Sequence, residues 1–295
     1  MTCAALTRDP RHTNISFRLV LAVVLEALLA AALTGCASFK EVRAFASLSA
    51  NAASHESIAK DYIGALDRRK QYQPSKFHGE LEAQKIRREA QRASIDLLQQ
   101  TIADYMLGLD ALASGDIRTF DISLDDLSSR LNDATFLDSS QKGAVGALST
   151  LLARAATSVY RQHEMKKLIR DGNQPLQDII DATRNILKSG IVPDLQVESA
   201  LVKRYYDNFM LAPDNPKEPV AMALAEEAKA ETLGRIDDRI RNAQSYDAVL
   251  ETISEGHQYL YDHRNMIGNH ESDQQLQPYI DKLRAAYRIL VDVSR

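Results

Sequence analysis

Cysteine is almost missing from this chain of 295 residues, which contains only Cys3 and Cys36. Residues 37–295 therefore hold no thiol, and this excludes a disulfide, a thiolate nucleophile and a cysteine metal ligand from that region. Tryptophan is absent, and glycine occurs only 12 times. We therefore expect the packing of side chains to stabilise the fold.

Short motifs that carry chemistry are also missing. The chain has no Gly-x-x-x-x-Gly-Lys-Ser phosphate loop, no Gly-x-Ser-x-Gly nucleophile turn and no His-Glu-x-x-His or Glu-x-x-His metal motif. We therefore predict a protein that is not an enzyme, with no catalytic residue, no cofactor and no metal site.

A strong charge of either sign is lacking as well. The chain has 36 Lys and Arg against 40 Asp and Glu, and the two signs are interspersed. Nucleic-acid binders present a basic patch instead, so we expect no nucleic-acid partner.

What the sequence does contain is an N-terminal targeting pattern. Residues 1–18 are polar and include three arginines, and residues 19–33 are apolar except for Glu26. A charged start, a short apolar run and a small-residue cleavage site are typical of a secretory signal peptide. A buried helix and an uncleaved membrane anchor are the alternatives, although the run is short for a span of about 20 residues.

The run ends in Leu33-Thr34-Gly35-Cys36, which resembles the lipobox of bacterial lipoproteins. The resemblance implies cleavage between Gly35 and Cys36 and lipid on Cys36, with two or more acyl chains giving stable anchoring. The residue after the cysteine is Ala37 rather than Asp. In lipoproteins of enteric bacteria, this resemblance implies sorting of the protein to the periplasmic face of the outer membrane. Residues 1–35 would be removed, and residues 36–295 would form one mature domain with 33 basic and 38 acidic residues.

Hydrophobic spacing in the body has the period of helices, and no alternating strand pattern or Asn-Gly hairpin signal appears. We predict an all-α fold, an elongated bundle of long, mostly antiparallel helices with short connections. The predicted helices cover residues 39–70, 77–113, 121–132, 141–170, 175–189, 194–211, 219–267 and 274–293.

Proline and glycine suggest where these helices end. We expect turns at 71–76, 171–173 and 191–194, because glycine and proline commonly interrupt helices. Three prolines make 212–219 the clearest interruption, either a surface loop or a subdomain boundary. Residues 219–267 keep helical phase and form either one helix or two that meet near Ser245.

Several polar or aromatic groups are candidate sites. His257 and His263 lie six apart on one predicted helix and so on different faces, which disfavours a shared metal ion. The carboxylate pairs Glu226-Glu227 and Asp237-Asp238 are predicted to lie on a wet helix face. The cluster of His270, Glu271 and Asp273 is predicted to lie in a solvated loop. The remaining group is predicted to lie at the edges of the core and consists of the tyrosines Tyr205, Tyr206, Tyr259, Tyr261, Tyr279 and Tyr287.

These features lead to two expectations about function. The first is a non-enzymatic binding or scaffolding lipoprotein of the cell envelope, held to the membrane by lipid on Cys36 and facing a protein partner. An inhibitor of the immunity type, which neutralises a toxin in the periplasm, is one version of it. The alternative is a bundle that binds a small molecule or a metal.

Overall fold

The computed structural model describes residues 39–55, 57–114, 130–131, 133–134, 136–156, 161–212, 218–269 and 274–293. Every regular element within these ranges is helical, which confirms the predicted all-α bundle. Contacts within residues 39–295 group them as one compact unit. The predicted signal peptide, the lipobox and most of the predicted helix 121–132 lie outside the described residues.

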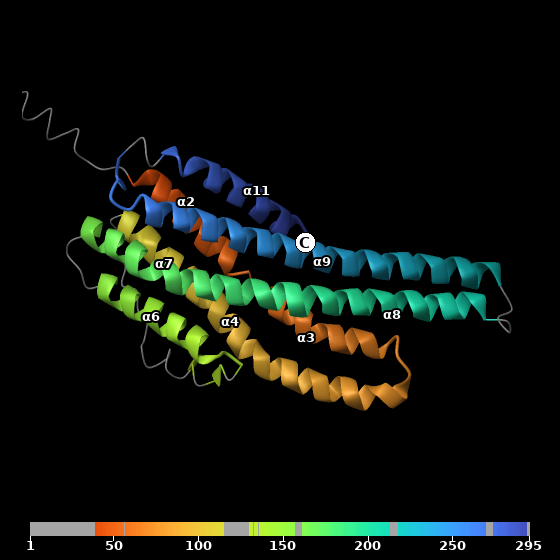
Figure 1. The fold of residues 1–295 in the computed structure, drawn as a ribbon. Helices are drawn as coiled ribbons and strands as arrows, with labels where there is room; N and C mark the ends of the chain where they lie inside the picture. The colour runs from red at the N-terminus through yellow and green to blue at the C-terminus, as the bar shows by residue number, and fades with distance from the viewer. Residues whose placement is uncertain are drawn as a thin grey trace, which may run out of the picture. The chain divides into compact units, whose positions relative to one another are not determined.

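The helices of the bundle are shown in Figure 1. Their bounds are α2 Lys40–Ala53, α3 Ser57–Lys70, α4 His78–Ser114, α6 Ser139–Ala156, α7 Arg161–Ile186, α8 Val192–Leu211, α9 Pro219–Asp262 and α11 Gln277–Val293. A short 3₁₀ turn, η1 Ser75–Phe77, leads into α4, and a π-helical turn, η2 Leu187–Ile191, joins α7 to α8. With 44 residues, α9 is about 66 Å long at 1.5 Å per residue.

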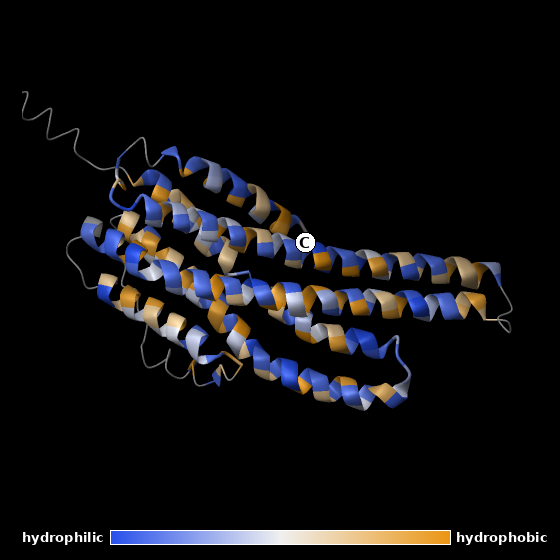
Figure 2. Ribbon diagram, in the orientation of Figure 1, coloured by the Kyte–Doolittle hydropathy of each residue, from blue (hydrophilic) through white to orange (hydrophobic). Residues whose placement is uncertain are grey.

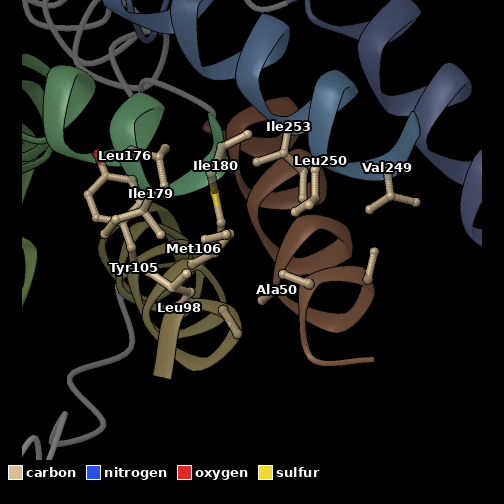
Figure 3. Packing of buried hydrophobic residues seen from close by; sticks show 14 of the residues in the cluster. Ala50, Leu98, Tyr105, Met106, Leu176, Ile179, Ile180, Val249, Leu250 and Ile253 are labelled. Carbon is tan, nitrogen blue, oxygen red and sulfur yellow. The ribbon is translucent and has the colours of Figure 1, made fainter. Parts of the chain in front are cut away.

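The core forms where α2, α4, α7 and α9 pack together. Figure 3 shows the aliphatic and aromatic side chains that these helices contribute to it, among them Leu98, Tyr105, Met106, Leu176, Ile179, Ile180, Leu250 and Ile253. All of them are buried. No thiol contributes to this part of the chain, so the burial of apolar area is the main stabilising term.

Two glycines allow close approach between core helices. A Cβ atom at Gly256 of α9 would overlap the buried ring of Phe45 in α2. At Gly172 of α7 it would lie 2.7 Å from the ring of Tyr105 in α4. Both glycines therefore fix distances between helices, and neither has a left-handed backbone in its helix.

The prediction of one helix over 39–70 is wrong, because α2 ends at Ala53 and α3 begins at Ser57. Other helices bind the backbone at this break. The hydroxyl of Tyr246 donates to the carbonyl of Ala53 at 2.8 Å, and the amide of Gln99 donates to the carbonyl of His55 at 3.1 Å. The break is stable because these side chains replace helical hydrogen bonds.

The predicted stops at 171–173 and 191–194 are also wrong. Residues 161–211 run without interruption through α7, η2 and α8, with Pro175 inside α7. Gly172 is required there by the ring of Tyr105, so it marks a packing contact rather than a helix end. Pro193 lacks a backbone N–H, and its ring crowds the preceding helical turn. The chain forms the wider π turn η2 just before it, and a single turn of this kind can accommodate the proline without ending the helix.

Three other predictions about element ends are confirmed. Residues 219–262 form one helix with no break at Ser245, and this helix ends five residues before the predicted end at 267. The turn after α3 and the end of α8 at Leu211 lie where proline predicts them.

The prediction of one helix over 141–170 is wrong, because α6 ends at Ala156, α7 begins at Arg161, and the two helices pack against each other. Residues 157–160 between them are not described.

The start of α6 shows how a local signal sets a boundary. The backbone N–H of Gln141 donates to the carboxylate of Asp138 at 2.8 Å, and the backbone N–H of Asp138 donates to the side chain of Gln141 at 3.1 Å. This reciprocal pair is a capping box, and it places the start two residues before the predicted one. None of the helices in the described ranges is long and apolar enough to span a membrane.

Candidate functional site

The predicted lipidation and cleavage residues, Gly35 and Cys36, lie outside the described residues. Three features of the described body remain as candidates for function. They are a buried polar chain around His257, an ionic cluster around Asp194 and an exposed apolar stripe on α8.

The buried chain links α4, α7 and α9 through hydrogen bonds. The hydroxyl of Tyr105 lies 2.7 Å from Nε2 of His257, and Nδ1 of His257 lies 2.9 Å from Oδ1 of Asn173. The amide of Asn173 donates to Gln258 at 2.9 Å, and the amide of Gln258 donates to Asp262 at 3.0 Å. The chain thus runs from the core to the exposed end of α9.

The carboxylate of Asp262 fixes the direction of all these bonds, because a carboxylate only accepts. Each amide then donates towards Asp262, so His257 donates from Nδ1 and its Nε2 accepts the hydroxyl hydrogen of Tyr105. The carbonyl of Leu168, 3.1 Å from the same hydroxyl, is its second possible acceptor. Both ring nitrogens of His257 therefore have partners within the protein.

Burial decides the protonation of this chain. His257 is fully buried, and desolvation lowers its pKa to about 3, so the ring is neutral at neutral pH. Burial, and then the charge of Asp171, raise the pKa of Tyr105 well above its usual value. The arrangement is a satisfied polar network that aligns three helices.

The other histidine candidates do not join this chain. His263 follows the end of α9, and its ring stacks on Tyr259 with 4.2 Å between the ring centroids. His163 is exposed on α7, and the predicted loop cluster of His270, Glu271 and Asp273 is not described. Within the described ranges, no three His, Cys, Asp or Glu side chains lie close enough to hold a metal ion.

The ionic cluster joins α3, α4 and α8 around Asp194. The guanidinium of Arg88 binds both carboxylate oxygens of Asp194, at 2.6 and 2.7 Å, and Arg69 binds the same carboxylate at 2.7 Å. Beside them, Arg68 binds both oxygens of Glu198, at 2.7 and 3.0 Å. The guanidinium of Arg88 also lies over the ring of Tyr62.

Most of the hydrogen-bonding capacity of this cluster is used internally. Arg69 also donates to the backbone carbonyl of Asp194, and Arg88 donates to the carbonyl of Tyr62 at 2.7 Å. The side chains of Arg69, Arg88 and Glu198 are almost fully buried. A buried charge destabilises a protein unless it is paired, and the charges of this cluster pair across helices. Among the described side chains, the cluster therefore acts as a structural tie between α3, α4 and α8.

The exposed apolar stripe corrects a prediction about α8. Val197, Leu201, Tyr205 and Phe209 follow one another at four-residue spacing, which predicts that they share one face of the helix over 194–211, and Tyr205 was expected at the edge of the core. In the structure Val197, Tyr205 and Phe209 are each about half exposed, whereas Leu195, Glu198 and Val202 form the buried face. The helical spacing is present, but the neighbouring helices cover the adjacent face.

This part of the molecule holds an unusual share of exposed apolar side chains. Twelve large hydrophobic residues are exposed among those described, and six lie on α8 or the start of α9. The six are Val197 at 52%, Tyr205 at 48%, Phe209 at 46%, Leu211 at 80%, Val220 at 65% and Leu224 at 60% exposure. Figures 1 and 2 show α8 and α9 continuing past the turn between α3 and α4, with apolar residues up to their ends.

Tyr205 is held firmly although it is exposed. Its ring meets Tyr72 edge-on with 5.5 Å between centroids, and it meets Tyr206 edge-on at 5.4 Å. Tyr72 and Tyr206 are also neighbours, at 6.2 Å. Contacts of this kind stabilise aromatic rings, so the exposed part of Tyr205 is presented in a fixed orientation.

The predicted wet face of α9 is largely confirmed, and its cations pair partly within α9 and partly with other helices. Glu226, Glu227 and Asp237 are exposed, and Asp238 pairs with Arg241 on the same helix. Lys229 instead pairs with Asp207 of α8, and Arg239 pairs with Asp61 of α3 at 3.4 Å. These pairs tie α9 to its neighbours.

Comparisons with known proteins yield no match to a family model, to a curated protein or to a solved structure. Inference about function therefore depends on the sequence and on the three features above.

The four-residue spacing on α8 is visible in the sequence, but the exposure of the side chains at that spacing is not. No sequence signal separates a stripe that faces a neighbouring helix from one that faces solvent, because both have the same period. The ionic cluster was not foreseen either, since its members lie up to 130 residues apart in the chain.

Proposed function

We propose that this protein is a lipid-anchored binding module of the bacterial envelope, held by Cys36 and engaging a protein partner through the α8–α9 end of its bundle. One observation carries the proposal: half of the exposed large hydrophobic side chains in the described residues lie on α8 and the start of α9. Exposed apolar side chains gathered in one part of a molecule are typical of interaction sites.

The composition of the surface also favours a protein partner. Tyrosine and phenylalanine are enriched in the centres of protein interfaces, where they supply much of the binding energy. Tyr205 and Phe209 lie four residues apart, so they project from the same side of α8. Tyr72 and Tyr206 order the ring of Tyr205 in advance, which lowers the entropy lost on binding.

The polar interior gives less support to the alternative of a small-molecule or metal-binding bundle. His257 and Tyr105 are bonded to each other and to neighbouring residues. The ligand of such a bundle would have to break these bonds and enter a packed core. An immunity-type inhibitor remains one version of the proposed binding module.

The test is crosslinking in intact cells followed by affinity purification, with the wild type compared with Cys36→Ala. We expect one protein to be captured repeatedly by the wild type and much less by the variant, because the lipid places the two partners on one membrane. A secreted toxin as that protein would support the inhibitor version. An anchored wild type that captures nothing specific would refute the binding proposal.

A further inference from the structure

We infer that the end of the bundle at Phe39 rests on the phospholipid headgroups of the membrane that holds Cys36, and that the α8–α9 end points away from it. This inference rests on the proposed lipid anchor and adds which surface of the body meets the membrane. The described residues that we assign to this surface, the anchor end, are Phe39, Lys40, Tyr261, Arg264 and Met266.

The chain between the lipid site and the first helix is too short to act as a spacer. Cys36 and Phe39 are three residues apart, so their Cα atoms are separated by about 11 Å at most, even in an extended chain. Phe39 already belongs to the body, because its side chain packs against the core and its carbonyl accepts the N–H of Arg43 at 2.8 Å. A lipid on Cys36 therefore holds the start of α2 close to the membrane surface.

The end of α9 lies at the same end of the bundle as the start of α2. Tyr246 of α9 binds the carbonyl of Ala53, and Gly256 lies against the ring of Phe45, so the two helices run antiparallel. The part of α9 beyond Gly256 and the part of α2 before Phe45 are therefore neighbours. Figure 1 shows them close together, with the end of α8 and the start of α9 at the opposite end.

The side chains of the anchor end suit a headgroup layer. Met266 is 49% exposed, and the guanidinium of Arg264 lies over the ring of Tyr261, 4.6 Å from its centroid. Tyrosine and long cationic side chains are typical of membrane–water interfaces, because one part of each is apolar and the other is polar. Within the described parts of the chain neither Arg264 nor the exposed Lys40 pairs with a carboxylate, so both are available to lipid phosphates.

The short tether, rather than attraction to anionic lipid, selects this orientation. Glu41 and Asp262 lie beside the cations of the anchor end, so the described charges there are mixed. The opposite end begins at Pro219 of the same long helix, about 65 Å from Asp262. In this orientation its exposed apolar side chains are out of reach of the headgroups and stay available to the protein partner.

Fluorescence quenching by headgroup-labelled lipid tests the inference on the full lipidated protein in phosphatidylcholine vesicles. The mature body contains no cysteine and the sulfur of Cys36 carries the lipid, so one introduced cysteine takes a bimane label specifically. The label is placed at Met266→Cys and, at similarly exposed positions elsewhere, at Leu224→Cys on α9, Ile289→Cys on α11 and Ile86→Cys on α4. With a nitroxide on the headgroup, we expect position 266 to lose most of its fluorescence and the other three to lose little.

A longer tether supplies the matched control. An insertion of about 20 Gly and Ser residues between Ala37 and Ser38 forms a coil with a mean span of about 25 Å. It should abolish most of the quenching at position 266 while the protein stays on the vesicles and circular dichroism shows it folded. Unchanged quenching would show that the tether does not place this end, and it would overturn the inference.

The remaining outcomes separate this inference from the proposed function. Quenching at Ile289, Ile86 or Leu224 as strong as at Met266 would mean that a side or the opposite end of the bundle meets the membrane. That result, or no quenching at any position, would overturn the inference, whereas a protein that stays on the vesicles and captures its partner in cells would keep the proposed function. A mature protein that carries no lipid and leaves the vesicles would overturn both.

Discussion

A neutral histidine in the core makes the stability of this protein depend on pH. The pKa of His257 is about 3 in the folded protein and about 6.5 in an unfolded chain, so the unfolded state binds the proton between these values. The contribution of this residue to stability is therefore complete above pH 6.5 and is lost as the pH falls towards 3.

We predict that His257→Gln makes the free energy of unfolding less sensitive to pH than it is in the wild type. Protonation of His257 in the unfolded state should cost the wild type about 2 kcal/mol between pH 7 and pH 5. Urea titrations at the two pH values measure the difference. His163→Gln, at an exposed position, is the control and should retain the wild-type loss. Equal losses in His257→Gln and the wild type would contradict the prediction.

Because glycine has no side chain, a single glycine can allow two helices to approach closely. Gly256→Ala places a Cβ atom against the buried ring of Phe45, and we expect a loss of about 1–3 kcal/mol from overpacking between α2 and α9. Gly234→Ala on the same helix meets no atom within 4 Å, and it should gain up to about 1 kcal/mol of helix stability. Opposite shifts in thermal midpoint check the pair, and a loss in both would contradict the packing argument.

At the scale of elements, the ionic cluster decides how α3, α4 and α8 hold together. Asp194→Asn leaves the buried guanidinium groups of Arg69 and Arg88 without their carboxylate, and we predict a loss of about 3–5 kcal/mol. Asp281→Asn breaks an exposed pair with Arg284 and should cost about 0–1 kcal/mol. Chemical denaturation compares the two, and similar costs would show that the cluster is not a structural tie.

Hydrophobic periodicity predicted the all-α fold class and most of the helices, because a helix with one buried face has apolar residues at regular three- and four-residue steps in the sequence. The phase of α9, for example, continues through Ser245, and the helix does too. The errors lie where distant residues override local preference. Tyr105 explains Gly172 inside α7, and Tyr246 and Gln99 bind the backbone at the break after α2. These contacts join residues 44 to 193 positions apart, so no local pattern records them.

The candidate sites divide in the same way. The sequence placed His257 and His263 on different faces, and the structure buries the first and leaves the second at the end of α9. The partners of His257 could not be predicted, because Tyr105 and Asn173 come from two other helices. On α8 the four-residue spacing predicts one shared face, but Tyr205, which was expected at the edge of the core, is about half exposed.

At the scale of the whole molecule, the anchor and the body should be separable. We predict that Cys36→Ala moves the protein from the membrane fraction to the soluble fraction without changing its thermal midpoint, because no other residue of the mature chain is a cysteine. Fractionation and circular dichroism measure the two properties. A variant that has lost residues 1–35 and still stays in the membrane fraction would show that the lipid is not the anchor.

The uninterrupted run from Arg161 to Leu211 has a consequence for reach. Its 51 residues form one rod of about 75 Å, so the distance of the α8 stripe from the start of α7 is set by the number of helical residues between them. Lengthening α8 and α9 together by seven residues would move the stripe about 10 Å along the bundle and turn it by only about 20°. For the binding module that we propose, the body would then act as a ruler, and a partner fixed at one distance from the anchor would no longer meet the stripe.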